Sequence, residues 1–362
     1  MKNIIERRIC RSITVGNVKI GGGSPIVIQS MANTDPHDIE AIFRQVMALA
    51  EAGCEVVRLA VPDEQSAGVF RELKARGVKV PLVADIHFDY RIALAAAAAG
   101  ADKIRINPGN IGSRERTKAV VDACRERKIP IRIGVNSGSV EREILEKYGA
   151  PTAEALAESA LLHARILEEL DFYDIALSVK SSDVMTTVAA NRILAKKTDY
   201  PLHLGVTEAG ARERGRIKSS IGIGTLLAEG IGDTVRVSLT ENPIEEVEAA
   251  RQILSVLGLT NRGGMEIVSC PTCGRTKIDL IGLSEEFERR AKAEGLFSMN
   301  IKVAVMGCAV NGPGEAREAD IGIAGGNGDG LIFKQGKTVK RVPEERLIDE
   351  LIQEIKAMRD GV

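Results

Sequence analysis

Three cysteines near the C-terminal end of the chain have the spacing of metal ligands. Cys270 and Cys273 share one Cys-x-x-Cys loop directly after a predicted strand, and Cys308 follows another predicted strand in a glycine-rich stretch. Thiolates are soft ligands that suit zinc and iron–sulfur clusters. Glycines beside them let backbone amides approach cluster sulfurs and tune the reduction potential. The spacing predicts a metal site and leaves zinc and iron–sulfur both open.

Three cysteines are one short of a full four-thiolate set, so a fourth ligand is needed. Glu315 follows Cys308 beyond a glycine-rich bend and can supply an oxygen. The other cysteines are Cys10, Cys54 and Cys124, and all belong to the first two-thirds of the chain. The last two lie in or beside predicted helices, where a buried structural thiol is the commonest role. A zinc ribbon would need a second Cys-x-x-Cys or Cys-x-x-His pair, which the sequence lacks.

Four arginines lie within predicted strands, each between aliphatic neighbours, and a lysine ends another predicted strand after an aliphatic residue. Strand side chains alternate between two faces, so each charge lies on the face opposite the aliphatic residues that would pack on helices. We therefore expect all five to point into the lumen of a barrel, where an unpaired charge is costly. These residues are Arg58, Arg105, Arg132, Lys180 and Arg236.

Such a set of cations predicts a strongly anionic ligand. Phosphate groups fit best, because the guanidinium fork of arginine matches their oxygens. The simpler interpretation pairs each cation with a local carboxylate, which would explain any single arginine equally well but all five together less well. The candidate carboxylates are Asp85, Asp102, Glu208 and Asp233.

Further polar residues follow aliphatic runs where strands are expected to end. In a parallel barrel the functional residues lie at the C-terminal ends of the strands. Glu208 is the best candidate for a general acid or base, because it ends a predicted strand facing the cationic pocket, although a pairing with a nearby arginine competes with this role. His87 is either a proton donor or a hydrogen-bonded wall residue. The other predicted substrate-binding residues are Asp85, Asn107, Asn136 and Ser238.

The elements that must position these residues alternate short β-rich runs with helical stretches. Eight βα units over about 230 residues fit one closed parallel barrel. An open doubly wound sheet is the alternative, but no nucleotide-binding fingerprint accompanies it. We predict an α/β fold with a (βα)8 TIM barrel over residues 1–260. The strand candidates begin near Ile26, Val56, Leu82, Ile104, Ile131, Ile175, Leu202 and Val235.

The pattern changes after Asn261–Gly264, which we interpret as a domain boundary. Short strands then mix with two helices near 284–293 and 344–359. This mixture is typical of a small α+β domain, which we place at residues 265–362.

Composition limits the classes of function. The 362 residues carry 49 basic and 50 acidic side chains, so the basic surplus usual for nucleic-acid binding is missing. No apolar run reaches the roughly 18 residues needed to span a bilayer. The N-terminal residues have no apolar core of a secretory signal. A cytoplasmic protein is expected, in which cysteines serve as thiols or metal ligands rather than as disulfides.

Together these motifs resemble one family, (E)-4-hydroxy-3-methylbut-2-enyl diphosphate synthase of the non-mevalonate isoprenoid pathway. The resemblance runs nearly end to end, and the last of its motifs is the most specific. The chain has no extra domain between barrel and tail, unlike the longer plant-type forms. The motifs are Gln29–Thr34, Ala84–Phe88, Arg105–Asn110, Gly205–Gly210 and Cys308–Glu315.

The resemblance implies a reaction and its machinery. The substrate would be 2-C-methyl-D-erythritol 2,4-cyclodiphosphate, whose ring is opened by two electrons with loss of a hydroxyl as water. Ferredoxin or flavodoxin would supply the electrons. A [4Fe–4S] cluster would be held by Cys270, Cys273, Cys308 and Glu315, and Glu208 would handle protons. The family is a homodimer in which one subunit's cluster domain closes over the other's barrel.

Two other classes of function compete with this one. A barrel phosphosugar lyase or aldolase could carry a structural zinc module, with Lys180 as its Schiff-base lysine. A non-enzymatic scaffold or metal-delivery protein would not need five cations at a barrel mouth. A radical S-adenosylmethionine enzyme is disfavoured, because no Cys-x3-Cys-x2-Cys run is present.

Overall fold

The computed structural model describes residues 5–260, 264–308 and 316–361, and the chain divides into two compact units, Met1–Thr260 and Asn261–Val362. Each unit has its own apolar core, built mostly from aliphatic side chains. No helix within these ranges is long and apolar enough to cross a membrane.

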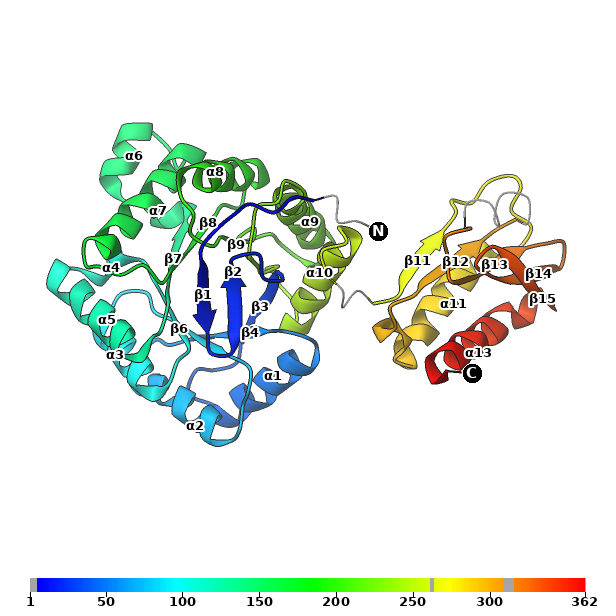
Figure 1. Ribbon diagram of the computed structural model, residues 1–362, viewed down its shortest axis with the longest axis horizontal. Helices are drawn as coiled ribbons and strands as arrows, with labels where there is room; N and C mark the ends of the chain where they lie inside the picture. Colours follow the sequence, from blue (N-terminus) through cyan, green and yellow to red (C-terminus); the bar gives the residue numbers. More distant parts are fainter. Residues whose placement is uncertain (1–4, 261–263, 309–315, 362) are drawn as a thin grey trace. The chain divides into compact units, whose positions relative to one another are not determined.

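The first unit is a closed barrel of parallel strands, which confirms the predicted fold (Figure 1). The strand order is β8-β7-β6-β5-β4-β3-β10-β9, and a parallel bridge between Leu177 and Leu202 closes the ring. The strands are β3 (Val27–Met31), β4 (Val56–Ala60), β5 (Leu82–Asp85), β6 (Lys103–Ile106), β7 (Ile131–Asn136), β8 (Ile175–Lys180), β9 (His203–Leu204) and β10 (Thr234–Val235).

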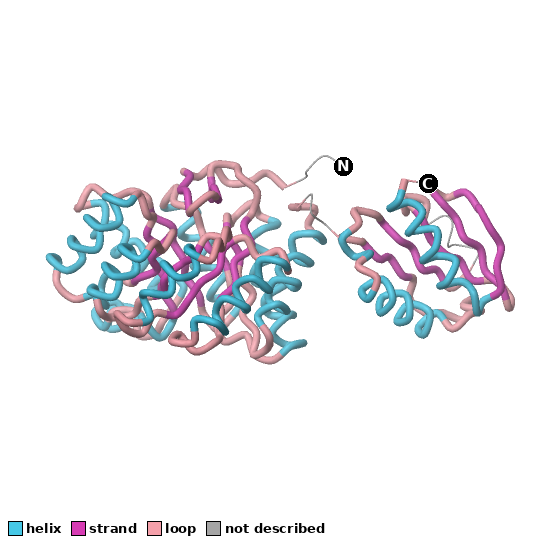
Figure 2. Tube along the Cα trace, turned by 90° about the horizontal axis from the view of Figure 1, so that it is seen from below, coloured by secondary structure: helices cyan, strands magenta, loops and turns pink. Residues whose placement is uncertain are grey.

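Helices surround the barrel strands (Figures 1 and 2). Several begin after a side chain that accepts a first-turn backbone N–H, as Asp38 does before α1 and Asp183 before α8. Their apolar faces pack on the outer side of the strands. The helices are α1 (Ile39–Glu51), α2 (Val69–Ala75), α3 (Tyr90–Ala99), α4 (Pro108–Ile111), α5 (Arg114–Arg127), α6 (Arg142–Tyr148), α7 (Ala153–Glu168), α8 (Val184–Lys197), α9 (Arg212–Ala228) and α10 (Pro243–Val256).

An antiparallel hairpin that the sequence did not predict closes one end of the barrel. Its strands are β1 (Ser12–Val15) and β2 (Val18–Gly21). Buried hairpin side chains, including Ile13 and Ile20, form a small cluster with Val56 and Val83 at the starts of β4 and β5. The N-terminal end of the barrel is therefore filled with apolar side chains, and the C-terminal end carries the polar residues.

The alternation expected for the strands is seen clearly in β4. Val57 and Leu59 belong to the core shared with the helices, whereas Val56 packs in the cluster under the hairpin. Arg58 has the same parity as Val56 and lines a cavity inside the barrel. The strand cations thus reach the lumen because the pleat sends alternate side chains inward.

The second unit is a five-stranded mixed sheet with the order β11-β12-β13-β14-β15. β11, β12 and β13 are parallel, and β14 and β15 continue the sheet antiparallel. Buried faces of two helices pack against the sheet. This confirms the predicted small α+β fold, although β15 was not predicted. The elements are β11 (Glu266–Ser269), α11 (Leu280–Ala293), β12 (Lys302–Met306), β13 (Ile321–Gly325), β14 (Asp329–Lys334), β15 (Lys337–Pro343) and α13 (Leu347–Asp360).

Candidate functional site

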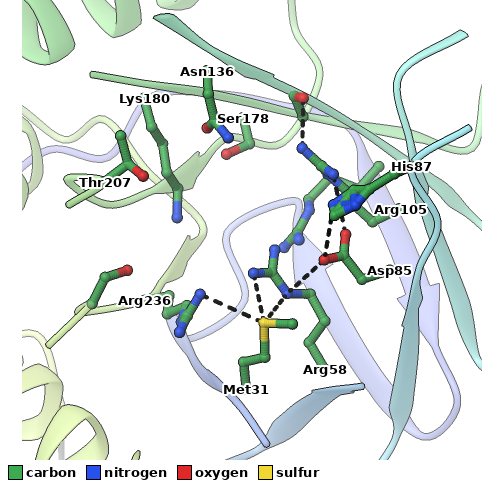
Figure 3. Close-up of a pocket in the computed structure, with 13 residues that line it drawn as sticks. Met31, Arg58, Asp85, His87, Arg105, Asn136, Ser178, Lys180, Thr207 and Arg236 are labelled. Atoms are coloured by element: carbon green, nitrogen blue, oxygen red, sulfur yellow. Dashed lines mark hydrogen bonds and ion pairs between the residues drawn. The ribbon is translucent and has the colours of Figure 1, made fainter. Parts of the chain in front are cut away.

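A cavity of about 290 Å³ opens at the C-terminal ends of the barrel strands (Figure 3). All five predicted strand cations line it; four come from the different strands β4, β6, β7 and β8, whereas Arg236 directly follows the short strand β10. This is the end at which barrels carry their functional residues. The lining residues are Met31, Arg58, Asp85, His87, Arg105, Arg132, Gly134, Asn136, Ser178, Lys180, Thr207, Arg236 and Ser238.

Asn107 is the one predicted substrate-binding residue that does not line this cavity. It follows β6, and its side chain is buried, with no hydrogen-bond partner among the described residues for either the oxygen or the nitrogen. The structure brings the other predicted substrate-binding residues together; their roles toward a ligand stay predictions.

Glu208 does not occupy the position expected for it. β9 ends at Leu204, so Glu208 is in a turn beyond the strand, with a left-handed φ of 50° and an exposed side chain. It does not line the cavity, although its neighbour Thr207 does. The reason is the shortness of β9, which leaves the chain free to turn before it reaches Glu208.

Asp85 is the only carboxylate among the cavity-lining residues. Arg105 donates to Asp85 Oδ1 at 3.2 Å, and Arg58 Nε lies 3.8 Å from Oδ2. His87 Nε2 lies 3.6 Å from the same oxygen, although more than half of the His87 side chain is exposed. Burial alone would raise the pKa of Asp85, but the neighbouring Arg58 and Arg105 lower it below its ordinary value. Asp85 is therefore ionised and offsets part of the positive charge.

Arg236 has a carboxylate partner that the sequence did not predict. Arg236 Nε and Nη2 donate to the two oxygens of Glu246 on α10, each at 3.2 Å. Two of the carboxylates predicted to pair with strand cations have other partners. Asp102 pairs with Lys74 at 2.6 Å, and Asp233 pairs with Arg7 at 2.9 Å. Pairing with a nearby carboxylate thus explains some of the strand cations, but it does not explain all of them.

Met31 was also missed, and its sulfur lies between two arginines (Figure 3). Arg58 donates to Met31 Sδ from Nε at 3.0 Å and from Nη2 at 2.8 Å, and Arg236 Nη1 lies 3.8 Å from the same sulfur. A thioether is a weak acceptor with no charge. It orients both guanidinium groups without neutralising them.

Arg132 and Lys180 have no carboxylate within 4.0 Å among the residues described. Arg132 donates to Gln29 Oε1 at 3.1 Å, and Lys180 Nζ lies 3.3 Å from His203 Nε2. Burial, followed by the neighbouring arginines, lowers the pKa of both cations well below their ordinary values. The same causes lower the pKa of Arg58 to about 10. A multiply charged anion is the ligand that would relieve this repulsion.

Ser178 is another cavity-lining residue that was not predicted, although its position in the strand indicates that it faces inward. It has the same strand parity as Lys180, so the alternation that sends the lysine inward also sends the serine inward. Thr207 lies beyond the end of its strand, where no periodicity applies, and Gly134 lines the cavity through backbone alone.

The cysteines divide into two chemical groups. Cys54 and Cys124 are buried in the barrel unit, and burial raises the pKa of both thiols to about 12. Cys273 is exposed, and hydrogen bonds from Arg275 lower the pKa of its thiol. Cys270 and Cys308 are half-buried. Cys10 is buried in the barrel unit as well, so the thiols that solvent reaches are those of the second unit.

Neighbouring parallel strands bring the two cysteine loops together. β11 pairs with β12 so that Ser269, just before Cys270, is level with Val305. The backbone N–H of Gly307 donates to Cys270 Sγ at 3.2 Å, one residue before Cys308. Glu315, the predicted fourth ligand, lies outside the described residues. Within the residues described, no group of three or more His, Cys, Asp or Glu side chains is close enough to hold a metal ion.

Two solved structures show a similar barrel fold. A type I 3-dehydroquinate dehydratase from Clostridium difficile aligns with a TM-score of 0.50 and 14% identity, covering 69% of this chain and 98% of the enzyme. A dihydropteroate synthase from Yersinia pestis aligns with a TM-score of 0.50 and 12% identity, covering 69% and 100%.

Sequence relatives extend over the whole chain. A 4-hydroxy-3-methylbut-2-en-1-yl diphosphate synthase (flavodoxin) of Caldanaerobacter subterraneus subsp. tengcongensis is 58% identical, over 97% of this chain and 98% of its own. The Clostridium perfringens protein of that name is 58% identical, over 98% and 100%. Residues 10–251 match the GcpE TIM-barrel domain, and residues 266–357 match the GcpE protein C-terminal domain. Both units, in this order, therefore make the chain a member of the GcpE family.

Proposed function

We propose that this protein converts 2-C-methyl-D-erythritol 2,4-cyclodiphosphate to (E)-4-hydroxy-3-methylbut-2-enyl diphosphate. The reaction consumes two electrons and two protons, opens the ring at a carbon–oxygen bond and releases water. Synthases of this name are 58% identical to this chain over nearly its full length, which supports the assignment.

The observation that carries the proposal is the imbalance of charge in the barrel cavity. Five cations line it, and among the residues described only two carboxylates pair with them, Asp85 in the cavity and Glu246 from α10. A cyclic diphosphate brings several negative charges in a compact shape, which arginine forks and the lysine can bind directly. In this proposal the barrel, residues 1–260, holds the substrate. The binding side chains are Arg58, Asp85, His87, Arg105, Asn107, Arg132, Asn136, Lys180, Arg236 and Ser238.

The thiols of the second unit fit an iron–sulfur cofactor. Cys270, Cys273 and Cys308 are soft donors on neighbouring loops, and the Gly307 amide already donates to one sulfur. We assign these cysteines and Glu315 as ligands of a [4Fe–4S] cluster in residues 265–362. When bound, the cluster would supply single electrons and a Lewis-acidic iron.

The residues of the chain itself bind, orient and move protons. The guanidinium groups of Arg58 and Arg236 hold the diphosphate in an orientation fixed by Met31. Glu208, on its exposed turn beside Thr207, delivers protons once the turn faces a bound substrate. Flavodoxin is the electron donor, the protein acts in the cytoplasm, and it works as a homodimer.

Anaerobic turnover tests this function. Reconstituted protein is supplied with the cyclic diphosphate and a low-potential reductant, and the allylic diphosphate is measured. Glu208→Gln should abolish product while the iron and sulfide content stays unchanged. Glu315→Ala should lower both product and iron. Absence of turnover in protein with a full complement of iron and sulfide would refute the proposal.

The alternative of a phosphosugar lyase or aldolase with a structural zinc module is not favoured. The relatives reported above are named as synthases, and this chain matches them over nearly their whole length. The sequence also lacks the second cysteine pair that a zinc ribbon needs.

A further inference from the structure

Lys180 differs from the other cavity cations in its immediate surroundings. It ends β8, is buried, and directs its amine into the cavity beside Thr207 (Figure 3). Its one hydrogen-bond partner among the residues described is His203 Nε2 at 3.3 Å. A Cβ at position 205 would lie 2.7 Å from Lys180 Nζ, so Gly205 leaves room for the amine. The amine is thus held by the His203 ring, and no carboxylate among the residues described lies within 4.0 Å of it.

His203 is fixed on its other side as well. Its Nδ1 lies 2.6 Å from Thr234 Oγ1, and Thr234 is level with His203 across the β9–β10 pair. When the Lys180 ammonium donates to Nε2, the ring proton must be on Nδ1 and be donated to the Thr234 hydroxyl. The ring is almost fully buried. A chain of hydrogen bonds therefore runs from Thr234 through His203 to Lys180.

The charges that face this pair are almost all positive. Burial, then the surrounding cations, lower the pKa values of Lys180 and His203 well below their ordinary values. Arginine remains charged in proteins, so lysine and histidine are the groups that can release protons to relieve the repulsion. The groups with the largest effect are Arg58 on β4, Lys103 on β6, Arg132 on β7, Arg236 after β10, and the acid Glu246 on α10.

We propose that His203 is a positioning residue that holds the Lys180 amine in the cavity, and that this pair takes up a proton from solvent when the diphosphate binds. This inference rests on the proposed function for the identity of the ligand. The ligand's negative charge makes the ammonium form of Lys180 favourable, and the neutral ring of His203 accepts its hydrogen bond. Binding then weakens as pH rises, because the concentration of free protons falls and binding requires one.

Calorimetric titration of the oxidised holoenzyme with the cyclic diphosphate measures the proton directly. The heat is compared in Pipes, Hepes and Tris buffers, whose ionisation enthalpies differ. We expect proton uptake on binding that increases with pH, because burial and the neighbouring cations lower the pKa of Lys180 in the ligand-free protein. Lys180→Arg should bind with no such uptake, because a guanidinium is already charged. His37→Gln, which alters an exposed histidine outside the cavity, should keep the wild-type uptake.

The positioning role is tested by a second pair of variants. His203→Phe removes the acceptor for Lys180 Nζ and should raise the dissociation constant about tenfold, the equivalent of one hydrogen bond to a charged group. His203→Gln offers an amide oxygen to the same amine and should restore much of the affinity. Equal affinity of the Phe and Gln variants would refute the positioning role.

The outcomes also separate this inference from the proposed function. Wild-type binding without proton uptake, or equal uptake by Lys180→Arg, refutes the inference and leaves the function standing. Failure of the cyclic diphosphate to bind wild-type protein refutes the function instead. Inorganic pyrophosphate is then the probe of the same cavity, and its binding without proton uptake would refute the inference as well. Lys180→Arg keeps the test decisive if His203→Phe fails to fold.

Discussion

Asp85 and Arg105 are directly opposite each other on neighbouring strands, and Arg105 Nη1 donates to Asp85 Oδ1 at 3.2 Å. The register of β5 and β6 therefore places the one carboxylate of the cavity beside one of its five cations. Arg105 Nη2 also donates to the Gly134 carbonyl at 2.9 Å, on the next strand. This arrangement fixes the guanidinium of Arg105, while Arg132 and Lys180 have no carboxylate within 4.0 Å among the residues described.

Replacement of Asp85 by Asn should destabilise the ligand-free protein. Arg58 and Arg105 would lose their shared carboxylate, and we expect a loss of about 1–3 kcal/mol in the free energy of unfolding. Denaturant unfolding measures it. Added pyrophosphate should stabilise the variant more than the wild type, because the anion replaces the lost negative charge. A variant as stable as the wild type without anion would contradict this account of Asp85.

Arg132→Met should have opposite effects on stability and on binding. Arg132 is buried, and its only polar partner among the residues described is the Gln29 amide oxygen. An apolar side chain of similar length removes an uncompensated buried charge, so the free energy of unfolding should rise by about 1 kcal/mol. Affinity for the cyclic diphosphate should fall about 100-fold, as expected for loss of a bidentate contact to phosphate.

The control for Arg132→Met is Arg192→Met, on the outer surface of the barrel. Arg192 pairs with Glu229 where both side chains are exposed, so its loss should change stability by less than about 1 kcal/mol. Binding should not change. A clear loss of stability in Arg132→Met would show that Arg132 has a structural partner that the cavity geometry does not reveal.

The stability of the ligand-free protein should depend on pH through Lys180. Burial and neighbouring cations lower its pKa in the folded state, whereas the unfolded chain has the ordinary lysine pKa near 10.4. Between these values the unfolded state binds more protons, so the free energy of unfolding rises with pH. Below the folded pKa both states are protonated and the contribution is flat.

Comparison with Lys180→Met isolates this contribution. Denaturant unfolding between about pH 7 and about pH 9 should give a steeper rise for the wild type than for the variant. The buried Lys103, whose pKa is also lowered, contributes the same sign in both proteins and cancels in the difference. Parallel curves would mean that Lys180 has the same pKa in both states.

Gly134→Ala should weaken ligand binding through Arg105. A Cβ at position 134 would lie 2.5 Å from Arg105 Nε and 3.0 Å from its Nη2, so the guanidinium must move. We expect affinity for the diphosphate to fall about tenfold, equivalent to one displaced charged contact. Gly224→Ala on α9 is the matched control, because nothing lies within 4 Å of its Cβ position. That variant should bind normally and gain roughly 0.5–1 kcal/mol from helix propensity.

Cysteine replacement should separate ligands from structural thiols. Cys270→Ala should lose iron and acid-labile sulfide after anaerobic reconstitution. Cys124→Ala should keep both and lose only about 1 kcal/mol of stability from a buried thiol. Iron and sulfide assays with the visible absorption spectrum give the result. Full iron content in Cys270→Ala would remove that residue from the ligand set.

Much of the site could be predicted because its signals are local. The strand arginines are bracketed by aliphatic residues and Lys180 follows Val179, and the two-residue period of a strand requires Arg58 and Lys180 to face away from these neighbours. The Cys270–Cys273 pair is similarly visible in four consecutive residues. Capping side chains such as Asp38 and Asp183 mark helix starts, so the alternation of strands and helices was also readable.

The partners of those residues could not be predicted in the same way. Glu246 reaches Arg236 from a helix, Met31 orients Arg58 from a neighbouring strand, and His203 meets Lys180 only where β8 and β9 close the ring. Each contact depends on strand register and barrel closure, which are properties of the whole sheet. The two-residue period of a strand predicted which way side chains point. That period stops where β9 ends at Leu204, so it could not predict the direction of Glu208.

The sequence by itself determined which charges enter the barrel and which thiols lie on one loop, because both follow from the geometry of consecutive residues. Only the tertiary structure decided which of those charges are neutralised. Pairing requires atoms from separate strands to come within a few ångströms. Strand register brings Asp85 to Arg105 and α10 brings Glu246 to Arg236, whereas closure of the ring between β8 and β9 brings only the imidazole of His203 to Lys180.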